Sequence, residues 1–323
     1  MKASVIIPVY NAERKLPKCL ASLRAQTYPD VECCFVDDCS TDGSLALIES
    51  FARDSGREVV ICRHDVNKGV AAARNTALDA ISGDVVCWVD ADDWLEPTAI
   101  EKGVAAIENG NTDIVGWEWM LSFNQNERYM KQAPFATPVE ALKNMMAGVM
   151  RWNLWLFMAR RSLYEENSAR FTPTMDMGED LALMMRLFLH AKEVKLLPEA
   201  LYHYAQTEAS VSNGFTEKTI RQVTFNVGVV ERAVSESAFA TDLMPCMAFL
   251  KLNIKLPLLI SDNKQNYAQW SSWFLEANPY IMQNKALPLR TRLLQWSASH
   301  KQWWLVRLYY RLVYKLVYGV IYK

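Results

Sequence analysis

The sequence of 323 residues lacks several features that mark common classes of protein. Lysine and arginine are not in excess, since the formal net charge is −1, which argues against a protein that binds nucleic acid. No uncharged stretch reaches the ~18 residues that a membrane-spanning helix needs. The apolar run at the N-terminus meets Pro8, too early for the core of a signal peptide. With 51% hydrophobic residues, the chain instead has enough apolar content for one sizeable core or two modest ones.

The cysteines lack the spacing of a metal or redox site. The chain has seven cysteines but no Cys-x-x-Cys pair, and six of the seven precede residue 90. In apolar segments such as these, cysteine usually serves as a small core residue. We therefore expect reduced thiols and a cytoplasmic protein.

Short β-branched segments alternate with segments of helical spacing in the first half of the chain. The strand-like segments are residues 4–9, 31–36, 58–63, 84–89 and 112–117. Such alternation predicts βαβ units, a largely parallel sheet and right-handed crossovers. Residues 120–205 have a looser α+β pattern, and the chain beyond residue 206 is mostly helical in pattern.

Polar residues follow the ends of three of these strands: Asn11 after the first, Asp37 and Asp38 after the second, and Asp90 after the fourth. In parallel sheets, ligands bind at the carboxyl ends of the strands, so a nucleotide pocket is expected there. An aspartate at such a junction can also cap the next helix, which is the interpretation we favour for Asp42.

The segment CWVDADDWLEP, residues 87–97, places Asp90, Asp92 and Asp93 within four positions. Close carboxylates repel one another unless water, a cation or a base offsets their charge. The cluster therefore either surrounds something positive or marks the start of a helix, where Asp93 would be the cap. The cluster alone does not separate these alternatives.

Five motifs occur in order over residues 4–180: SVIIPVYNAE, VDDCSTDGS, NKGVAAARN, VDADDW and GED. This order resembles the nucleotide-sugar glycosyltransferases of family 2, whose catalytic domain has the GT-A fold. The resemblance implies an α/β fold with a Rossmann-like, mostly parallel sheet flanked by helices. The resemblance covers about the first two thirds of the chain. From the change in composition, we place the catalytic domain in residues 1–205 and a helical C-terminal region in residues 206–323.

The resemblance assigns the acidic cluster to a metal and to the donor. A departing diphosphate develops negative charge, and a divalent cation held by oxygen ligands stabilises that charge. By similarity, Asp92 is the main ligand of Mn²⁺ or Mg²⁺, Asp90 serves both ribose and metal, and Asp93 is a supporting residue or a cap. Oxygen ligands suit these ions better than Zn²⁺.

The resemblance also implies a base-binding site. Asp38 matches the position that hydrogen-bonds the base, and Pro8, Val9 and Tyr10 form the loop against which the base packs. A carboxylate that accepts from an imide N–H favours uracil over neutral cytosine, which lacks that donor. A UDP-sugar is therefore the expected donor.

Two residues of NKGVAAARN belong to the same expected pocket. Gly69 allows the backbone to approach a ligand closely. Arg74 either faces the nucleotide or makes an internal salt bridge. The residues themselves leave both roles of Arg74 open.

The GED motif, Gly178 to Asp180, opens a helical segment with two acids. Glu179 is adequately explained by the helix dipole. The resemblance assigns Asp180 as the general base that takes a proton from the acceptor hydroxyl. One base opposite the leaving diphosphate implies in-line displacement and inversion.

Residues 201–213 resemble the family's mobile loop over the diphosphate, although the position that is often basic is Ala205 here. His203 is a candidate metal ligand or diphosphate donor, or a packed residue in an aromatic strand. Trp152 and Trp155 lie in the region that corresponds to the acceptor side. With eleven tryptophans in the chain, core packing is the default interpretation for both.

The C-terminal segment has a strong excess of positive charge. No acidic residue follows Glu276, whereas eight cations do: Lys285, Arg290, Arg292, Lys301, Arg307, Arg311, Lys315 and Lys323. Arg307, Arg311 and Lys315 recur every fourth residue and predict one cationic stripe on an aromatic helix. Such a helix suits the surface of an anionic membrane, and the alternative is a helix packed on the domain with a solvated basic face.

Together these observations predict an inverting, metal-dependent hexosyl- or N-acetylhexosaminyltransferase. We expect it to act on a glycan or lipid-linked acceptor in bacterial surface polysaccharide or lipooligosaccharide synthesis, on the cytoplasmic face of the inner membrane. An inactive relative that acts as a binding subunit is the main alternative. A nucleotidyltransferase is disfavoured because the Gly-rich, Lys-bearing triphosphate loop is missing. A receiver-like module is disfavoured because it is much shorter.

Overall fold

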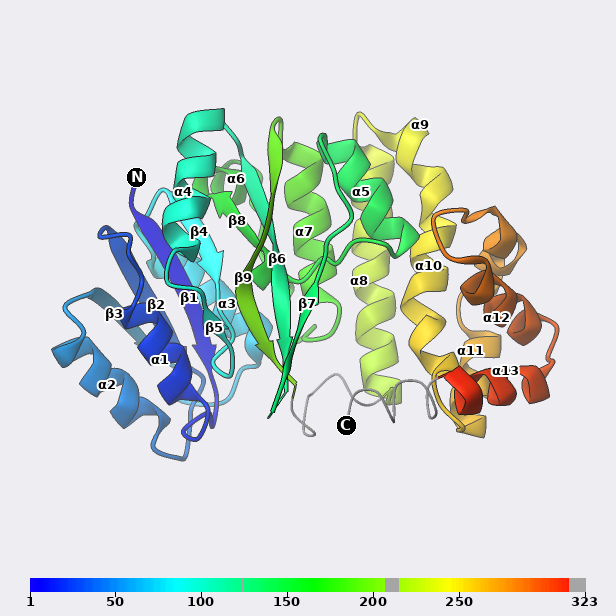
Figure 1. Cartoon of the computed structure of the whole chain (residues 1–323), viewed down its shortest axis with the longest axis horizontal. Coiled ribbons are helices and arrows are strands. Elements are labelled where there is room, and N and C mark those ends of the chain that lie inside the picture. The colour runs from blue at the N-terminus through cyan, green and yellow to red at the C-terminus, as the bar shows by residue number, and fades with distance from the viewer. Residues whose placement is uncertain (124, 207–214, 314–323) are drawn as a thin grey trace.

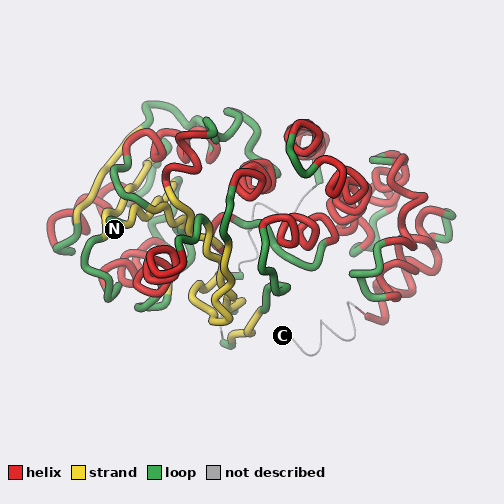
Figure 2. Tube along the Cα trace, turned by 90° about the horizontal axis from the view of Figure 1, so that it is seen from above, coloured by secondary structure: helices red, strands yellow, loops and turns green. Residues whose placement is uncertain are grey.

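The computed structural model describes residues 1–123, 125–206 and 215–313. Its centre is one nine-stranded sheet with the strand order β3-β2-β1-β4-β8-β6-β9-β5, and β7 pairs with β6 beside this path. Figure 1 shows the sheet in the left and middle of the molecule and a group of helices at the right. Seen from above in Figure 2, helices lie on both sides of the strands. The α/β fold class predicted from the sequence is confirmed.

The first half of the sheet is parallel, as the alternating pattern predicts. It consists of β1 (Ala3–Val9), β2 (Val31–Asp37), β3 (Glu58–Arg63) and β4 (Val85–Trp88). β1 pairs in parallel with both β2 and β4, and β2 pairs in parallel with β3. Every residue of β2 and of β4 is buried, which is typical of strands covered on both faces.

The second half of the sheet is mixed. β8 (Phe157–Arg160) is antiparallel to both β4 and β6 (Ile114–Ser122) and so joins the two halves. β9 (Val194–Ala205) runs parallel to β6, with a register irregularity near Trp117 to Trp119. Two short antiparallel strands complete the sheet, β5 (Trp94–Leu95) on β9 and β7 (Glu127–Met130) on β6.

The helices of the sheet region follow from local sequence signals as well as from packing. They are α1 (Leu16–Arg24), α2 (Ser44–Asp54), α3 (Val70–Ala80), α4 (Ala99–Gly110), α5 (Pro138–Ala147), the 3₁₀ helix η1 (Leu154–Leu156), α6 (Arg161–Glu166) and α7 (Glu179–His190). Thr137 accepts a hydrogen bond from the Glu140 N–H and so caps α5, which has proline as its first residue. The N-cap of α3, Gly69, has a φ of 88°.

After β9 and Gln206, the structure describes the chain again from Phe215, and the elements there are helical. It comprises α8 (Glu217–Glu236), α9 (Ala240–Leu243), η3 (Met244–Cys246), α10 (Met247–Lys255), η4 (Leu256–Leu259), α11 (Lys264–Ser272), η5 (Leu275–Gln283), α12 (Leu289–Ser299) and α13 (Trp303–Tyr309). A capping box between Thr216 and Thr219 starts α8. None of the helices in the described ranges is both long and apolar enough to cross a bilayer.

The buried apolar side chains form two clusters that meet at α10. The larger cluster surrounds the sheet and runs from Ala3 to Leu250, so α8 and part of α10 belong to it. The smaller one, here the C-terminal core, consists of Leu252, Leu258, Leu259, Tyr267, Trp270, Trp273, Ala277, Ile281, Leu294, Ala298 and Val306. The predicted division of the chain at residue 206 stays a prediction.

All seven cysteines are free thiols, and four of them are buried.

Helix α13 contacts the rest of the protein through Trp303, Arg307 and Arg311. Trp303 stacks on Tyr267 with ring centroids 5.1 Å apart. Arg307 Nε lies 3.4 Å and Arg311 Nη2 lies 2.9 Å from the carboxylate of Asp262. The predicted cationic stripe is therefore partly bound to the protein through Asp262. Its third member, Lys315, lies outside the described residues, as does Lys323.

Candidate active site

The carboxyl ends of the parallel strands lie side by side, as the sequence analysis expects. Val9 pairs with Asp37 across β1 and β2, and Ile6 pairs with Trp88 across β1 and β4. Figure 1 shows β1 pointing towards the lower edge of the molecule, where β6 and β9 also end. The residues after β1, β2 and β4 are therefore placed at one edge of the sheet.

Asp38 is buried and holds the loop that leads from β3 to α3. Its Oδ1 lies 2.6 Å from Nδ1 of His64 and accepts from the Lys68 N–H, and its Oδ2 accepts from the Gly69 N–H at 2.8 Å. Each carboxylate oxygen has about two acceptor sites. One acceptor site of Oδ2 thus remains for a ligand, and the predicted contact of Asp38 with a base stays a prediction.

Pro8 and Val9 are the last residues of β1 and not part of a loop, and Tyr10 directly follows the strand. Pro8 is half-buried, Val9 is buried, and Tyr10 is exposed. Asn11 fixes the end of the loop, because its side-chain oxygen accepts a hydrogen bond from the Thr41 N–H at 2.8 Å. Tyr10 therefore stands at a rim where a planar group can pack against it.

Asp37 is a residue that the sequence analysis noted only as following a strand. It is fully buried; Oδ1 accepts from the Ser40 N–H at 3.2 Å, and Oδ2 has no hydrogen-bond partner within the part of the chain that the structure describes. The nearest cation in an ion pair with it is Arg63, whose Nε lies 3.8 Å from Oδ2. A buried oxygen without a donor is uncommon in folded proteins and marks a place where a ligand can donate.

The backbone of Gly69 lies close to a side chain of the protein, that of Asp176. A Cβ atom at residue 69 would lie 2.6 Å from Oδ2 of Asp176, and the φ of 88° favours glycine independently. Oδ1 of Asp176 accepts from the Ala71 N–H at 3.1 Å, in the first turn of α3. Asp176 thereby fastens the segment before α7 to the start of α3, a contact that no local sequence pattern indicates.

Arg74 gathers the acids of two separate motifs. Its buried guanidinium places Nη1 2.8 Å from Glu179 Oε1 and 2.7 Å from Asp180 Oδ1. Nη2 lies 3.5 Å from Asp90 Oδ1. Of the two roles considered for Arg74, the structure shows the internal salt bridges. It also shows that the end of β4 and the start of α7 meet at one point.

The acids around Arg74 carry more negative charge than one guanidinium neutralises. Burial raises the pKa of Asp90 to about 6. The nearby carboxylates of Asp180 and Asp92 raise this pKa further, and the positive charge of Arg74 lowers it. Burial likewise raises the pKa of Glu179 to about 8, again with a contribution from Asp180. Both shifts express the cost of placing like charges in a buried cluster, and a bound cation would lower that cost.

Asp92 and Asp93 differ in environment although they are adjacent. Asp92 is half-buried, with Oδ2 2.9 Å from Nζ of Lys15. Asp93 is fully buried; its Oδ2 accepts from the Tyr202 hydroxyl and its Oδ1 from the Ala205 N–H, both at 2.7 Å. Since α4 begins at Ala99, Asp93 is the supporting residue rather than the cap.

Ala205, at the end of β9, contacts the acidic turn through its backbone N–H. The hydrogen bond from the Ala205 N–H ties the end of β9 to the turn that carries Asp90 and Asp92. The Asp90 N–H donates to the Tyr202 hydroxyl at 3.1 Å and adds a second connection between the same segments. The part of the predicted mobile loop from residue 207 to residue 213 lies outside the described residues.

His203 faces away from this cluster. Its ring stacks on Trp94, with centroids 5.0 Å apart, and its nitrogens lie 2.7 Å from Glu96 Oε1 and 3.0 Å from Glu127 Oε1. Both partners are acceptors, so a metal would have to displace one of them. We therefore leave His203 out of the metal site that we propose.

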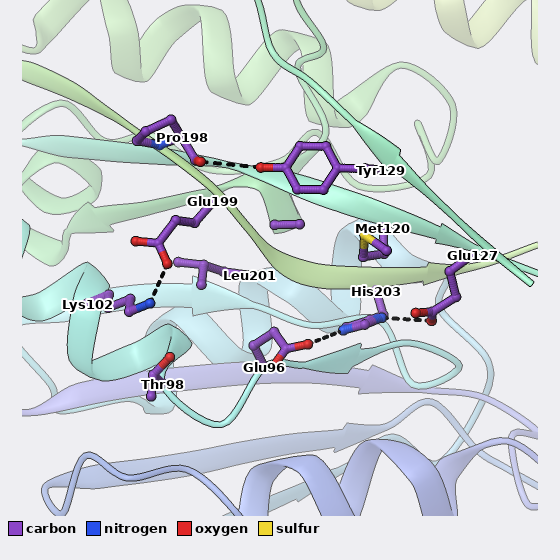
Figure 3. Close-up of a pocket in the computed structure, with 11 residues that line it drawn as sticks. Glu96, Thr98, Lys102, Met120, Glu127, Tyr129, Pro198, Glu199, Leu201 and His203 are labelled. Carbon is purple, nitrogen blue, oxygen red and sulfur yellow. Dashed lines mark hydrogen bonds and ion pairs between the residues drawn. The ribbon is translucent and has the colours of Figure 1, made fainter.

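A hollow of about 410 Å³ lies on the face of the sheet that His203 occupies. Figure 3 shows His203 between Glu96 and Glu127, and Lys102 paired with Glu199 at the other side of the hollow. None of Asp38, Asp90 and Asp180 lines it. The hollow is thus separate from the acidic cluster around Arg74.

The two tryptophans on the expected acceptor side are mainly core residues. Trp155 is buried, and its ring stacks on Tyr202 and Tyr204 at centroid distances of 4.5 and 5.4 Å. Trp152 is partly buried and packs against the larger core. Asp180 Oδ2 accepts from the Leu154 N–H at 3.3 Å, so these tryptophans belong to the segment that positions Asp180.

Among the described residues, no group of three or more His, Cys, Asp and Glu side chains forms a preassembled metal site. A magnesium or manganese site in a nucleotide-binding enzyme commonly has only one or two carboxylates, because substrate phosphates and water supply the other ligands. Asp90 and Asp92 provide that number of carboxylates at the end of β4.

Comparison with known proteins agrees with this geometry. Residues 4–189 match the model of glycosyl transferase family 2. The uncharacterized glycosyltransferase EpsJ of Bacillus subtilis is 30% identical over 216 residues, which cover 65% of this chain and 62% of EpsJ. Poly(ribitol-phosphate) beta-N-acetylglucosaminyltransferase TarS of Staphylococcus aureus is 27% identical over 208 residues, or 64% of this chain and 35% of TarS. The chain thus spans less than two thirds of either protein.

Solved structures resemble the whole described fold. TarS residues 1–349 in complex with UDP-GlcNAc superpose with a TM-score of 0.70 at 21% identity, over 97% of this chain and 91% of that one. Mannosyltransferase PcManGT from Pyrobaculum calidifontis, in complex with GDP-Man and Mn²⁺, gives a TM-score of 0.51 at 17% identity and covers 88% of each chain. These likenesses show the GT-A fold. The chain belongs to glycosyl transferase family 2.

Proposed function

We propose that this protein is an inverting, metal-dependent glycosyltransferase that moves a sugar from a UDP-sugar to a hydroxyl group of a glycan or lipid-linked acceptor. The observation that carries the proposal is the meeting of Asp90, Glu179 and Asp180 at Arg74. A donor-site acid and the proposed base thereby stand on opposite sides of one buried guanidinium. The acceptor hydroxyl and the donor must meet in such a place.

The proposed base is Asp180, with its carboxylate held at both oxygens. Arg74 donates to Oδ1, and the Leu154 N–H donates to Oδ2. A carboxylate held in this way keeps a fixed orientation while it accepts the proton of the attacking hydroxyl. Because it attacks on the side opposite the diphosphate, the hydroxyl inverts the configuration of the anomeric carbon.

The proposed metal ligands are Asp90 and Asp92. Their oxygens are the ligand type that Mn²⁺ and Mg²⁺ prefer, and the ammonium group of Lys15 already lies 2.9 Å from Asp92 Oδ2. A divalent cation bound there would supply positive charge beside the departing diphosphate. The structure of PcManGT contains GDP-Man and Mn²⁺, so a protein of this fold accommodates such an ion.

The proposed base-binding residues are Pro8, Val9, Tyr10 and Asp38, with Gly69 in the backbone that Asp38 holds. The remaining acceptor site of Asp38 suits a base that donates N–H, as uracil does. A TarS structure contains UDP-GlcNAc, which supports a uridine nucleotide as the donor here. Arg74 contributes indirectly, through Asp90.

The proposed cellular role is the synthesis of a bacterial surface polysaccharide or lipooligosaccharide on the cytoplasmic face of the inner membrane. TarS, by its name, modifies poly(ribitol phosphate), which is a polymeric acceptor. The excess of positive charge after Glu276 supports peripheral contact with an anionic membrane.

The test is a donor screen with the purified chain. We expect release of the nucleotide from UDP-sugars when Mn²⁺ is present, less or no release from GDP- and dTDP-sugars, and loss of release when a chelator is added. A thermal-shift measurement with the same nucleotides separates binding from turnover. Binding without any turnover, with all acceptors tried, would favour the inactive binding subunit. Absence of binding to every donor would refute the proposal.

A further inference from the structure

The outward faces of α12 and α13 carry apolar side chains that the fold does not bury. On α12 these are Leu289, Leu293 and Trp296, and on α13 and the turn after it they are Trp304, Leu308 and Leu312. Trp304 is 67% exposed and Leu308 is 46% exposed. Spacings of three and four residues place each set on one side of its helix. We call these two sets the outer stripes.

The opposite faces of the same helices hold them in place. Leu294 and Ala298 of α12 and Val306 of α13 belong to the C-terminal core, and Trp303 stacks on Tyr267. Asp262 binds Arg307 and Arg311. Because these contacts fix both helices, the outer stripes are not needed to form the fold.

The charge around the outer stripes is positive. Lys285, Arg290 and Lys301 are exposed near them in the chain, and no acidic residue follows Glu276. Contiguous apolar surface of this kind marks an interaction site. Asp262, an acid that contacts α13, is paired with Arg307 and Arg311. Apolar and aromatic side chains together with an excess of cations match the headgroup region of an anionic bilayer.

We propose that the outer stripes of α12 and α13 dock this protein on an anionic phospholipid surface. The leucines and tryptophans enter the headgroup boundary, and Arg290 and Lys301 contact the lipid phosphates. A second copy of the chain fits less well, because a two-fold contact through these helices would bring one basic surface against another. The inference extends the proposed function by naming the surface that meets the membrane.

The position of the docking helices suits a membrane-bound acceptor. Figure 1 shows α12 and α13 at the end of the molecule remote from α2 and β3. It also shows α13 towards the lower edge, where β1, β6 and β9 end. Helix α13 and the candidate active site therefore lie towards the same edge of the molecule in this view.

The test measures co-sedimentation of the full chain with two kinds of vesicle, without any donor sugar. One kind contains equal parts of phosphatidylglycerol and phosphatidylcholine, and the other contains phosphatidylcholine alone. We expect binding mainly to the anionic vesicles and a strong decrease at high salt. The absence of a donor keeps the result independent of the proposed enzymatic reaction.

Variants locate the surface. Trp304→Ser combined with Leu308→Ser should lower the partition onto anionic vesicles at least about tenfold, because two apolar side chains no longer enter the lipid. Lys301→Gln should lower it about fivefold. The matched control is Phe225→Ser on α8, which removes an apolar side chain of similar exposure, 44%, outside both stripes. This control should bind as the original chain does.

Three results would overturn the inference: no binding of the original chain to anionic vesicles, equal binding to both kinds of vesicle, or unchanged binding of the Trp304 and Leu308 variant. A fourth would replace it with self-association. In that case light scattering would show a dimer for the original chain and a monomer for the variant, with vesicle binding absent in both. Circular dichroism checks that each variant is folded.

Discussion

Arg74 carries one positive charge against three carboxylates, and this imbalance defines the candidate active site. The guanidinium is buried, and its partners come from two segments: Asp90, which follows β4, and Glu179 and Asp180 of α7, which lie 105 and 106 residues from Arg74 in the chain. A buried arginine that contacts several carboxylates holds them in fixed positions. Removal of the arginine would leave several buried acids without a partner, so mutations at Arg74 would mix folding with function. The acids are therefore the better positions for a test.

Substitution of Asp180 by Asn tests the assignment of the base. Asparagine keeps the size of the side chain and can still accept from Arg74, but it cannot take a proton from the acceptor. We expect the transfer rate to fall by about 10²- to 10⁴-fold with donor binding nearly unchanged. Transfer kinetics and donor affinity by calorimetry measure the two effects separately.

Glu179→Gln is the matched control for that variant. It replaces the other carboxyl group of α7 that contacts the same guanidinium, at nearly the same distance, 2.8 Å instead of 2.7 Å. Since no base role is assigned to Glu179, transfer should persist. An equal loss in both variants would mean that the charge of the cluster, and not the base at Asp180, limits transfer.

Asp92 offers a test of the metal site through its partner Lys15. Asp92→Asn removes one of two proposed carboxylate ligands, so Mn²⁺-dependent donor binding should weaken by at least about tenfold.

Lys15→Met removes the cation that now lies 2.9 Å from Asp92. In this second variant, Mn²⁺ should bind as well as before or better, because it no longer competes with an ammonium group. Titration with Mn²⁺ followed by electron paramagnetic resonance measures both affinities, and weaker binding in Lys15→Met would contradict this account of the site.

A single site residue could be predicted where it belongs to a recognisable motif. Its role could not be predicted where it depends on a contact with a residue far away in the sequence. Asp90 and Asp180 were predicted for one site, and both contact Arg74. The partners of Arg74 remained open, because nothing local in NKGVAAARN indicates acids 105 and 106 residues away. Asp176 was missed for the same reason, since its contacts with Gly69 and Ala71 arise only when the segment before α7 meets α3.

The start of α3 depends on a glycine with two separate constraints. Gly69→Ala would place a Cβ atom 2.6 Å from Asp176 and would also force a side chain into a φ of 88°. We expect the free energy of unfolding to fall by about 2–4 kcal/mol, and donor binding to weaken because Asp38 loses a well-placed N–H donor. Chemical denaturation and donor titration measure the two effects.

Gly56→Ala separates backbone strain from steric contact in that experiment. Gly56 has a φ of 69°, but a Cβ atom there would meet nothing within 4 Å. Its substitution should cost only the strain, about 1 kcal/mol. If both variants lost the same stability, the contact between Gly69 and Asp176 would have no energetic importance.

Strands with a clear β-branched run were predicted from the sequence, and the shortest strands were not. The five predicted strands correspond to β1, β2, β3, β4 and β6, whose β-branched runs are long enough to be recognised. β5, β7 and β8 were not predicted, because two to four residues show no period and these strands exist through their pairing with β9, β6 and β4. The parallel half was therefore foreseeable, and the mixed half required tertiary structure.

The sequence predicts the positive charge of the C-terminal helices, but it does not predict which side of each helix faces solvent. The sequence predicts a cationic stripe, but Asp262 lies 49 residues before Arg311 and attracts both Arg307 and Arg311. The exposed side of these helices carries the apolar residues of the outer stripes as well as cations such as Arg311. Long-range contacts of the C-terminal core decide which side of α13 meets solvent.

The C-terminal core contains a buried lysine that makes its stability depend on pH. Nζ of Lys255 donates to the Trp273 carbonyl at 2.8 Å, to the Phe274 carbonyl at 3.3 Å and to Oδ1 of Asn278 at 2.7 Å. It also lies 4.1 Å from the centroid of the Trp270 ring. Lys255→Met leaves these acceptors unpaired, so it should lower the free energy of unfolding by about 2 kcal/mol near neutral pH. The exposed Lys285→Met should change it by less than about 0.5 kcal/mol.

The difference between the original chain and Lys255→Met should grow as the pH rises. Burial lowers the pKa of Lys255 to about 8 from an ordinary 10.5, although Glu276 raises it. Between these values the unfolded chain still holds the proton and the folded chain has lost it, so the free energy of unfolding rises with pH in this window. We expect the difference to increase by about 1–3 kcal/mol between pH 8 and pH 10.5, as measured by urea denaturation of both proteins. Tyrosines titrate in both proteins and cancel in the comparison, so a difference that does not change with pH would mean that the three acceptors keep Lys255 protonated in the folded state.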